Sequence, residues 1–154
     1  MELTYKPAGP ADLELLTATR IAVLRAVHHM DESVDLSALE AQNRLYYQNA
    51  LTRGDHAAWL VLDGEKFVGC GGVSFYQVLP TYHNPTGRCA YLMNIYTHPD
   101  YRRRGLGTRM VELLVGEARR RGVTHIGLDA TAMGRPLYEK YGFQSMPDEM
   151  ILPE

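Results

Sequence analysis

The chain has 154 residues, of which 45% are hydrophobic, so we expect one domain spanning residues 1–154. Its formal net charge of −2 argues against a nucleic-acid partner, because nucleic-acid-binding proteins usually carry a basic excess. No stretch is long and apolar enough to cross a bilayer, the N-terminus lacks the regions of a signal peptide, and the two cysteines suggest no disulfide framework, so we expect a cytoplasmic protein without a membrane partner.

The first half of the sequence predicts a strand, two helices and a pair of strands. Leu3 and Tyr5 alternate with polar neighbours, which is typical of a short strand. Apolar residues then recur at helical spacing after Pro10, and Ser37 and Glu40 form a plausible capping box for a second helix. The expected elements are helices over residues 10–27 and 37–52, and strands over 56–62 and 66–76 that flank a turn at 63–65.

The centre of the sequence predicts a strand, a basic glycine-rich turn and a helix in succession. Residues 90–97 are rich in aromatic and branched side chains and stop just before a proline, as a buried strand does. From Gly105 onward apolar residues fall on one helical face, and Gly122 is a natural C-terminal stop. Unpaired N–H groups at the start of this helix, two glycines and three adjacent arginines favour an anion site, most naturally for a pyrophosphate.

The last third of the chain predicts one more helix between two strands. Residues 78–88 contain two prolines and a glycine, so we expect a long loop there. A strand is expected over residues 123–131, a short helix over 134–141 and a closing strand over 143–152. The complete predicted order is therefore β-α-α-β-β-β-α-β-α-β.

Two motifs in this order resemble those of the GCN5-related N-acetyltransferase (GNAT) family. The spacing Arg102-x-x-Gly105-x-Gly107 is similar to the family's acyl-CoA pyrophosphate loop. The segment from Leu137 to Phe143 is similar to its Leu-Tyr-x-x-x-Gly-Phe motif. The resemblance implies an α/β (α+β) protein with the GNAT acyl-CoA N-acyltransferase fold, in which helices flank a mixed central sheet of about six strands.

The resemblance also implies acetyl-CoA as co-substrate and no metal ion. In the family the central strand bulges and splays from its neighbour, so Asn94 would lie near the bulge and free backbone groups beside it would bind the pantetheine arm and the thioester carbonyl. The residues implied for the pyrophosphate lie in the glycine-rich loop, and two further residues would border the cofactor. The implied cofactor-binding residues are Ile95, Tyr96, Thr97, Arg102, Arg103, Arg104, Gly105, Leu106, Gly107, Thr108, Thr131 and Arg135.

Tyr138 matches the tyrosine that the family places beside the leaving sulfur. A model thiol has a pKa of about 8.5 and a tyrosine about 10, so complete proton transfer from the phenol to the thiolate would be uphill. We therefore expect Tyr138 to stabilise the thiolate by a hydrogen bond.

The general base is not marked by the motif, because the central strand carries no carboxylate between Tyr91 and Thr97, where the family often has a glutamate. The candidates are Asp31, Glu32, His28, His29, His83 and Asp129. We favour Glu32 and Asp129, although either carboxylate would also suit a surface or structural role.

Together these features predict an enzyme that transfers an acetyl group from acetyl-CoA to a primary amine by direct attack through a tetrahedral intermediate. A small-molecule amine is expected, because the long loop and the segment between the first two helices could cover the site. The alternatives are a protein lysine or N-terminal acetyltransferase and a non-catalytic acyl-CoA-binding sensor, which the missing strand carboxylate keeps open. The resemblance allows a homodimer, but no sequence feature decides it.

Overall fold

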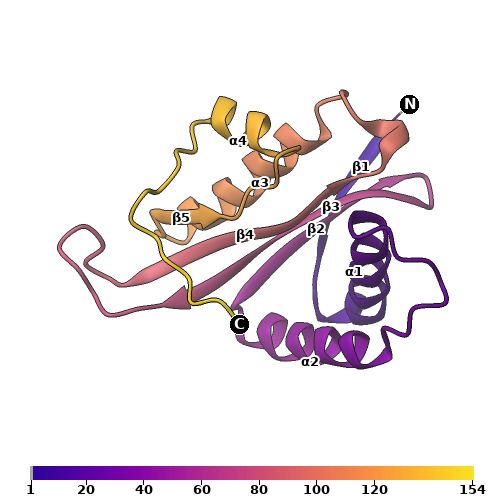
Figure 1. Cartoon of the computed structure of the whole chain (residues 1–154), viewed down its shortest axis with the longest axis horizontal. Helices are drawn as coiled ribbons and strands as arrows, with labels where there is room; N and C mark the ends of the chain where they lie inside the picture. The colour runs from indigo at the N-terminus through magenta and orange to yellow at the C-terminus, as the bar shows by residue number, and fades with distance from the viewer. Residues whose placement is uncertain (1) are drawn as a thin grey trace.

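A computed structural model describes residues 2–154 as a five-stranded sheet with helices on both faces (Figure 1). Two helices, α1 and α2, cover one face, while α3 and α4 lie on the other (Figure 1). In chain order the elements are β1 (Leu3–Ala8), η1 (Pro10–Asp12), α1 (Leu13–Val27), α2 (Ser37–Arg53), β2 (His56–Asp63), β3 (Lys66–Gln77), β4 (Arg88–Thr97), η2 (Pro99–Tyr101), α3 (Leu106–Arg120), β5 (His125–Leu128) and α4 (Arg135–Tyr141).

The sheet is mixed, as expected. Its order is β1-β2-β3-β4-β5; the first three junctions are antiparallel, and β4 and β5 run parallel. A parallel pair needs a crossover connection, which α3 supplies between β4 and β5. The predicted order of elements up to α4 is therefore confirmed.

The main core lies between the sheet and α3. The buried face of this helix consists of Leu106, Met110, Val111, Leu114, Val115 and Ala118, which pack against β2, β3 and β4. Gly71 makes this approach possible, because a Cβ at that position would overlap the Met110 side chain. The close backbone packing at this glycine fixes the distance between α3 and the central strands.

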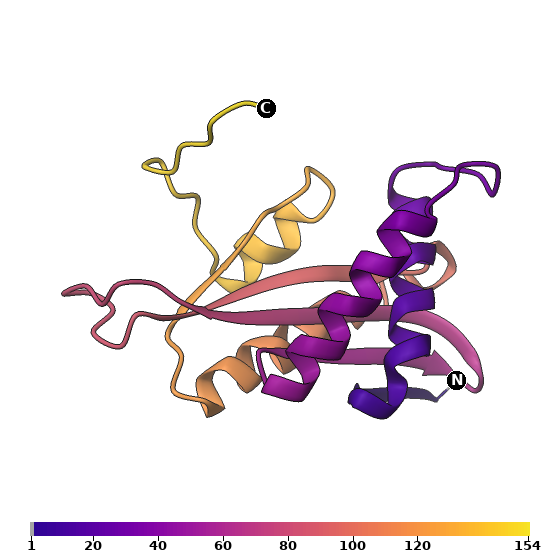
Figure 2. The ribbon, with the colours of Figure 1, turned by 90° about the horizontal axis from the view of Figure 1, so that it is seen from below.

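The predicted closing strand is wrong. Residues 143–154 form no helix or strand, and the end of this segment leaves the body of the molecule (Figure 2). Pro147 lacks the N–H that a sheet ladder needs, and the apolar side chains beyond it are consecutive and do not alternate. Met150, Ile151 and Leu152 are each at least 90% exposed, so the sheet has five strands and this segment adds none.

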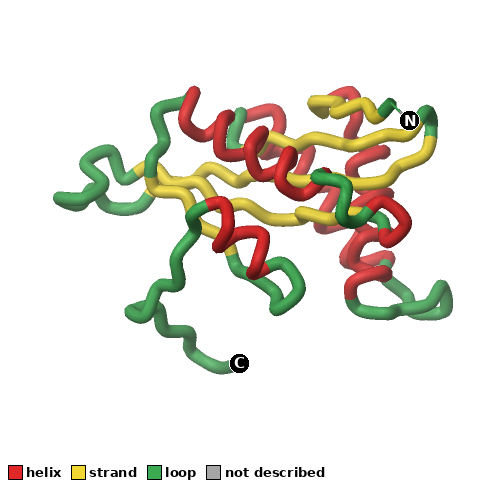
Figure 3. The backbone as a smooth tube through the Cα atoms, turned by 90° about the horizontal axis from the view of Figure 1, so that it is seen from above, coloured by secondary structure: helices red, strands yellow, loops and turns green. Residues whose placement is uncertain are grey.

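The loops lie at the ends of the sheet. Figure 3 shows the loop between β3 and β4 projecting beyond the sheet, with the C-terminal segment leaving the molecule separately. In the stretch from residue 2 to residue 154, no helix has the length and apolar character needed to cross a membrane.

Candidate functional site

The centre of the candidate site is the half of β4 that has no partner in β5. Four residue pairs join the two strands, from Cys89 with His125 to Leu92 with Leu128. Beyond Leu92, residues 93–97 of β4 pair with β3 on one side, but within residues 2–154 no strand pairs with their other edge. Backbone N–H and C=O groups on that edge are therefore available to a ligand.

A bulge interrupts β4 within this unpaired half. Gly72 pairs with Met93 and Cys70 with Tyr96, so two residues of β4, Asn94 and Ile95, lie opposite one residue of β3. Asn94 has a φ of +58°, in the left-handed region that asparagine tolerates better than most residues. The bulge near Asn94 that the resemblance implied is thus present.

The predicted anion loop connects η2 to α3. Arg103 and Gly105 have φ values of +63° and +84°, and they turn the chain so that α3 can begin at Leu106. The first helical hydrogen bond runs from the N–H of Arg109 to the carbonyl of Gly105, at 3.0 Å. The preceding N–H groups at the helix start are therefore available to an anion.

The charged part of this loop faces solvent. Arg102, Arg103 and Arg104 are all exposed, and the guanidinium of Arg104 lies 5.2 Å from the centre of the Tyr101 ring. Gly107 allows α4 to pack closely, because a Cβ there would come within 2.9 Å of Leu137 Cδ2. The loop thus combines positive charge, free helix N–H groups and a direct connection to α4.

Tyr138 lies on α4 and packs beside the same core. Its ring meets Phe143 edge-on at 6.2 Å, and Ile95 of the bulge packs against the same hydrophobic cluster. Burial raises the pKa of Tyr138 above its ordinary value, so the phenol keeps its proton and can donate a hydrogen bond. The structure therefore brings the bulge, the start of α3 and Tyr138 together around one core.

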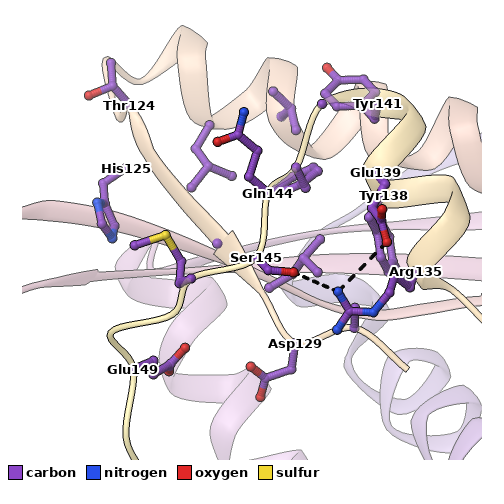
Figure 4. A pocket seen from close by; sticks show the side chains of 18 of the residues that line it. Thr124, His125, Asp129, Arg135, Tyr138, Glu139, Tyr141, Gln144, Ser145 and Glu149 are labelled. Atoms are coloured by element: carbon purple, nitrogen blue, oxygen red, sulfur yellow. Dashed lines mark hydrogen bonds and ion pairs between the residues drawn. The ribbon is translucent and has the colours of Figure 1, made fainter. Parts of the chain in front are cut away.

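A cavity lies beside β5, and residues of α3, α4 and the segment after α4 complete its lining. It has a volume of about 850 Å³, and Asp129, Arg135 and Tyr138 are among its lining residues (Figure 4). None of residues 95–97 or 102–108 lines it. The cavity therefore contains only part of the predicted site, and the bulge and the glycine-rich loop lie outside its lining. Its size alone does not identify it as the cofactor site.

Two predicted cofactor residues, Thr131 and Arg135, have local partners within the protein. Thr131 accepts a hydrogen bond from the N–H of Gly134 at 3.1 Å. Arg135 donates to Ser145 Oγ at 3.0 Å and lies 3.9 Å from Glu139 (Figure 4). The Thr131 contact stabilises the turn before α4, and the Arg135 contact joins α4 to the segment that follows it.

The two favoured base candidates lie in different places. Glu32 lies in the connection between α1 and α2, where its side chain is 94% exposed and 3.9 Å from Arg25. Asp129 directly follows β5 and interacts with Tyr91 of β4. Burial first, and then the hydrogen bond and charge of Asp129, raise the pKa of Tyr91 to about 12. Only Asp129 lies beside the strand pair that opens to form the candidate site.

A polar cluster on the α2 face was not predicted. Tyr46 Oη lies 2.8 Å from His56 Nδ1 and 2.5 Å from Ser74 Oγ. His56 is almost completely buried, and Nε2 is its side-chain atom without a hydrogen-bond partner in residues 2–154. Burial, and secondarily the charge of Arg121, lowers the pKa of His56 to about 4. No local pattern could reveal this cluster, because its members lie on α2, β2 and β3.

A second contact missed by the sequence analysis joins α1 to the bulge. Arg20 Nη1 donates to Asn94 Oδ1 at 2.9 Å, across 74 positions of sequence. No signal in the sequence links the two residues. As for metals, the described residues, 2–154, include no group of three or more His, Cys, Asp or Glu side chains placed to hold an ion.

Comparisons with known proteins match this architecture. The family model for the acetyltransferase (GNAT) family matches residues 24–143. The solved structure of a predicted acetyltransferase from Clostridium acetobutylicum, determined with acetyl-CoA, is 31% identical; the match covers 99% of this chain and 96% of that one, with a TM-score of 0.88. A GCN5-related N-acetyltransferase from Ralstonia eutropha JMP134 is 27% identical, with a TM-score of 0.82 and 99% of both chains covered.

A curated relative matches over a shorter stretch. The [ribosomal protein bS18]-alanine N-acetyltransferase of Escherichia coli (strain K12) is 42% identical over 57 residues, which are 35% of this chain. The match spans only 38% of that relative's length. The family match, in contrast, covers well over half of this chain, including the bulged strand, the glycine-rich loop and α4. The chain therefore belongs to the acetyltransferase (GNAT) family.

Proposed function

We propose that this protein is an acetyl-CoA-dependent N-acetyltransferase that moves the acetyl group directly to a primary amine. The observation that carries the proposal is the unpaired, bulged half of β4 beside the N-terminal loop of α3. A similar protein, 31% identical, was solved with acetyl-CoA, which supports the choice of co-substrate.

In this proposal the chain binds acetyl-CoA in two places. Backbone groups of residues 95–97 bind the pantetheine arm and the thioester carbonyl. The loop at residues 102–108 binds the pyrophosphate, because it combines helix N–H groups with three exposed arginines. We assign Thr131 and Arg135 no more than a bordering role, since both side chains already have protein partners.

Acetyl transfer then needs three contributions from the chain. The amine nitrogen forms a bond to the thioester carbon and the C–S bond breaks, so negative charge appears first on the carbonyl oxygen and then on the sulfur. Backbone N–H donors of the unpaired β4 edge stabilise the charge on oxygen. The Tyr138 phenol, whose pKa burial raises further above neutral pH, donates a hydrogen bond to the departing thiolate.

The third contribution is removal of a proton from the amine. An alkylammonium group with a pKa near 10.4 must lose its proton at pH 7 at a cost of about 4.5 kcal/mol, so a nearby base helps. We propose Asp129 as this base, because it lies where β5 parts from β4 and contacts Tyr91. Glu32 is a weaker candidate. Its side chain is almost completely exposed, and its ion-pair partner is Arg25 of α1.

We propose a small-molecule amine as the acceptor, with a protein N-terminus or lysine as the alternative. The curated relative that acts on ribosomal protein bS18 supports the alternative, but the similarity covers only 57 residues. A non-catalytic acyl-CoA sensor is the other competing function. The tyrosine at position 138 and the two glycines of the Arg102-x-x-Gly105-x-Gly107 motif argue against it.

The test is free-thiol release from acetyl-CoA with polyamines, amino acids, aminoglycosides, aminoalkyl compounds and short peptides as acceptors. Amine-dependent release with one small-molecule class supports the proposal and names the substrate class. Release with peptides alone establishes the protein alternative. Acetyl-CoA binding without release on any acceptor would contradict the enzyme reading and favour the sensor.

A homodimer also remains a proposal. Met146, Met150, Ile151 and Leu152 are largely exposed in the C-terminal segment, which leaves an apolar surface that a second copy could cover. Light scattering of the full chain against a chain ending at Ser145 tests this. A dimer that becomes a monomer on truncation supports the proposal, whereas a monomeric full chain refutes it.

A further inference from the structure

The bulge of β4 is strained, and it is held by side chains from outside the strand. Asn94 adopts a left-handed backbone conformation, which most residues with a Cβ avoid. The bulge also removes regular pairing with β3, and β5 has already ended on the other side. The backbone ladder alone therefore leaves this segment poorly fixed.

One of the contacts that hold it comes from α1, which lies under the half of β4 that extends beyond β5 (Figure 1). The Arg20 guanidinium donates to Asn94 Oδ1 at 2.9 Å. A second contact comes from β3, where Cys70 Sγ donates to the Asn94 carbonyl at 3.1 Å. Burial raises the pKa of the Cys70 thiol to about 12, so this donor keeps its proton. Asn94 is thus held at its side chain and at its backbone.

Arg20 makes a different kind of contact from Arg25 of α1 and Arg44 of α2. Arg25 pairs with Glu32, and Arg44 pairs with Glu14, in contacts near the surface. In residues 2–154, by contrast, Arg20 has no carboxylate within ion-pair distance, and its hydrogen bond goes to the Asn94 amide. Its positive charge is close enough to lower the pKa of the buried Cys70 thiol against the larger opposite effect of burial. The hydrogen bond to the Asn94 amide therefore links this charged side chain of α1 directly to the bulge.

We propose that Arg20 is a positioning residue for acetyl transfer, acting through Asn94 to fix the bulge that aims the backbone donors of residues 95–97. The inference rests on the proposed function, because those donors are assigned to the thioester carbonyl there. Donors for a developing oxyanion are effective only when they are fixed before the reaction. Loosening the bulge should therefore slow the chemical step, while acetyl-CoA, which also has the α3 loop to bind, keeps most of its affinity.

The experiment is a double-mutant cycle between Arg20 and Asn94, measured by steady-state thiol release. In the wild-type background, Arg20→Ala should lower kcat about tenfold and change the KM for acetyl-CoA less than twofold. Glycine adopts positive φ without strain, so in an Asn94→Gly background Arg20→Ala should lower kcat less than twofold. Arg20→Lys, which can still donate to the amide oxygen, should recover part of the loss. Arg44→Ala is the matched control, because it removes an arginine from a surface ion pair on the same helical layer.

Equal losses of kcat in both backgrounds, or a higher KM with unchanged kcat, would overturn the proposal. Hydrogen exchange provides a second measurement that does not depend on any acceptor. The amides of Met93 and Tyr96, which flank the bulge, should exchange at least about tenfold faster in Arg20→Ala, with β2 unchanged. Unchanged exchange at these amides would refute the effect on the bulge whatever the turnover. Faster exchange together with no turnover by the wild-type protein on any acceptor would instead refute the proposed function and, with it, the role in acetyl transfer.

Discussion

The buried histidine of β2 makes the stability of the fold depend on pH. His56 has a pKa of about 4 in the folded protein, mainly because burial disfavours its charged form, whereas a histidine in an unfolded chain titrates near 6.5. Between these two values the unfolded chain binds a proton that the folded chain does not. The free energy of unfolding therefore falls as the pH drops from about 6.5 towards 4, and its contribution from His56 is complete above pH 6.5.

The size of the effect follows from the difference between the two pKa values. A separation of about 2.5 units corresponds to roughly 3 kcal/mol, which is a large share of the stability of an ordinary domain. The contacts in the folded state explain why the proton is excluded. Nδ1 is occupied by Tyr46 Oη, Nε2 lies close against Gly72, and the charge of Arg121 adds to the effect of burial.

The assay is urea unfolding followed by the fluorescence of Trp59, at several pH values from 4 to 7.5. Carboxylates also titrate in this range, so the informative quantity is the difference between the wild type and His56→Asn. We expect the free energy of unfolding of the wild type to fall by roughly 3 kcal/mol more than that of His56→Asn over the range. His83→Asn, at an exposed position in the β3–β4 loop, is the control and should keep the wild-type slope. Parallel curves for the wild type and His56→Asn would refute the reasoning.

Three further predictions concern the proposed reaction. Tyr138→Phe removes a hydrogen bond to a charged leaving group, so kcat should fall about 10- to 100-fold. The CoA affinity, measured by calorimetry, should stay within about twofold of the wild-type value. Equal losses of kcat and of CoA affinity would contradict the role of Tyr138. Arg102→Ala removes an exposed cation from the anion loop and should weaken CoA binding several-fold at low salt, with a smaller loss at high salt; salt-independent binding would argue against a pyrophosphate there. Asp129→Asn should shift the rise of kcat/KM to higher pH, because the amine must then lose its proton unaided, while Glu32→Gln should leave the profile in place; the opposite result would exchange their roles.

Periodic patterns in the sequence were sufficient to predict most of the fold. The helix that begins at Leu106 shows its apolar face in every turn, and the strand that ends at Thr97 is followed by a proline. Such signals are local, because each depends on side chains a few positions apart. Periodicity alone did not predict the bulge at Asn94, because its expected position came from the family resemblance.

The C-terminal segment shows where local patterns mislead. Its apolar residues favoured a strand over residues 143–152, but a strand forms only when a neighbour accepts its hydrogen bonds and its apolar face. Pro147 and the consecutive run from Met150 to Leu152 prevent a regular pairing along β5.

The contacts that position the candidate site could not be predicted from the sequence. Arg20 of α1 and Asn94 of β4 are 74 positions apart, and Tyr46 of α2 contacts His56 of β2. These contacts arise only when α1, α2 and the sheet are packed together. The motif residues Arg102, Gly107 and Tyr138 were identifiable, whereas the side chains that hold the site in shape were not.

The most direct test of the proposed acetyl-CoA site is hydrogen exchange of the full chain with and without acetyl-CoA. We expect one bound molecule per chain and slower exchange at the amides of residues 95–97 and 105–108, where β4 is unpaired and α3 begins. Absence of binding would contradict the proposed function. Protection confined to the cavity outside β5, at residues 125–130, would contradict the assignment of the acetyl-CoA site.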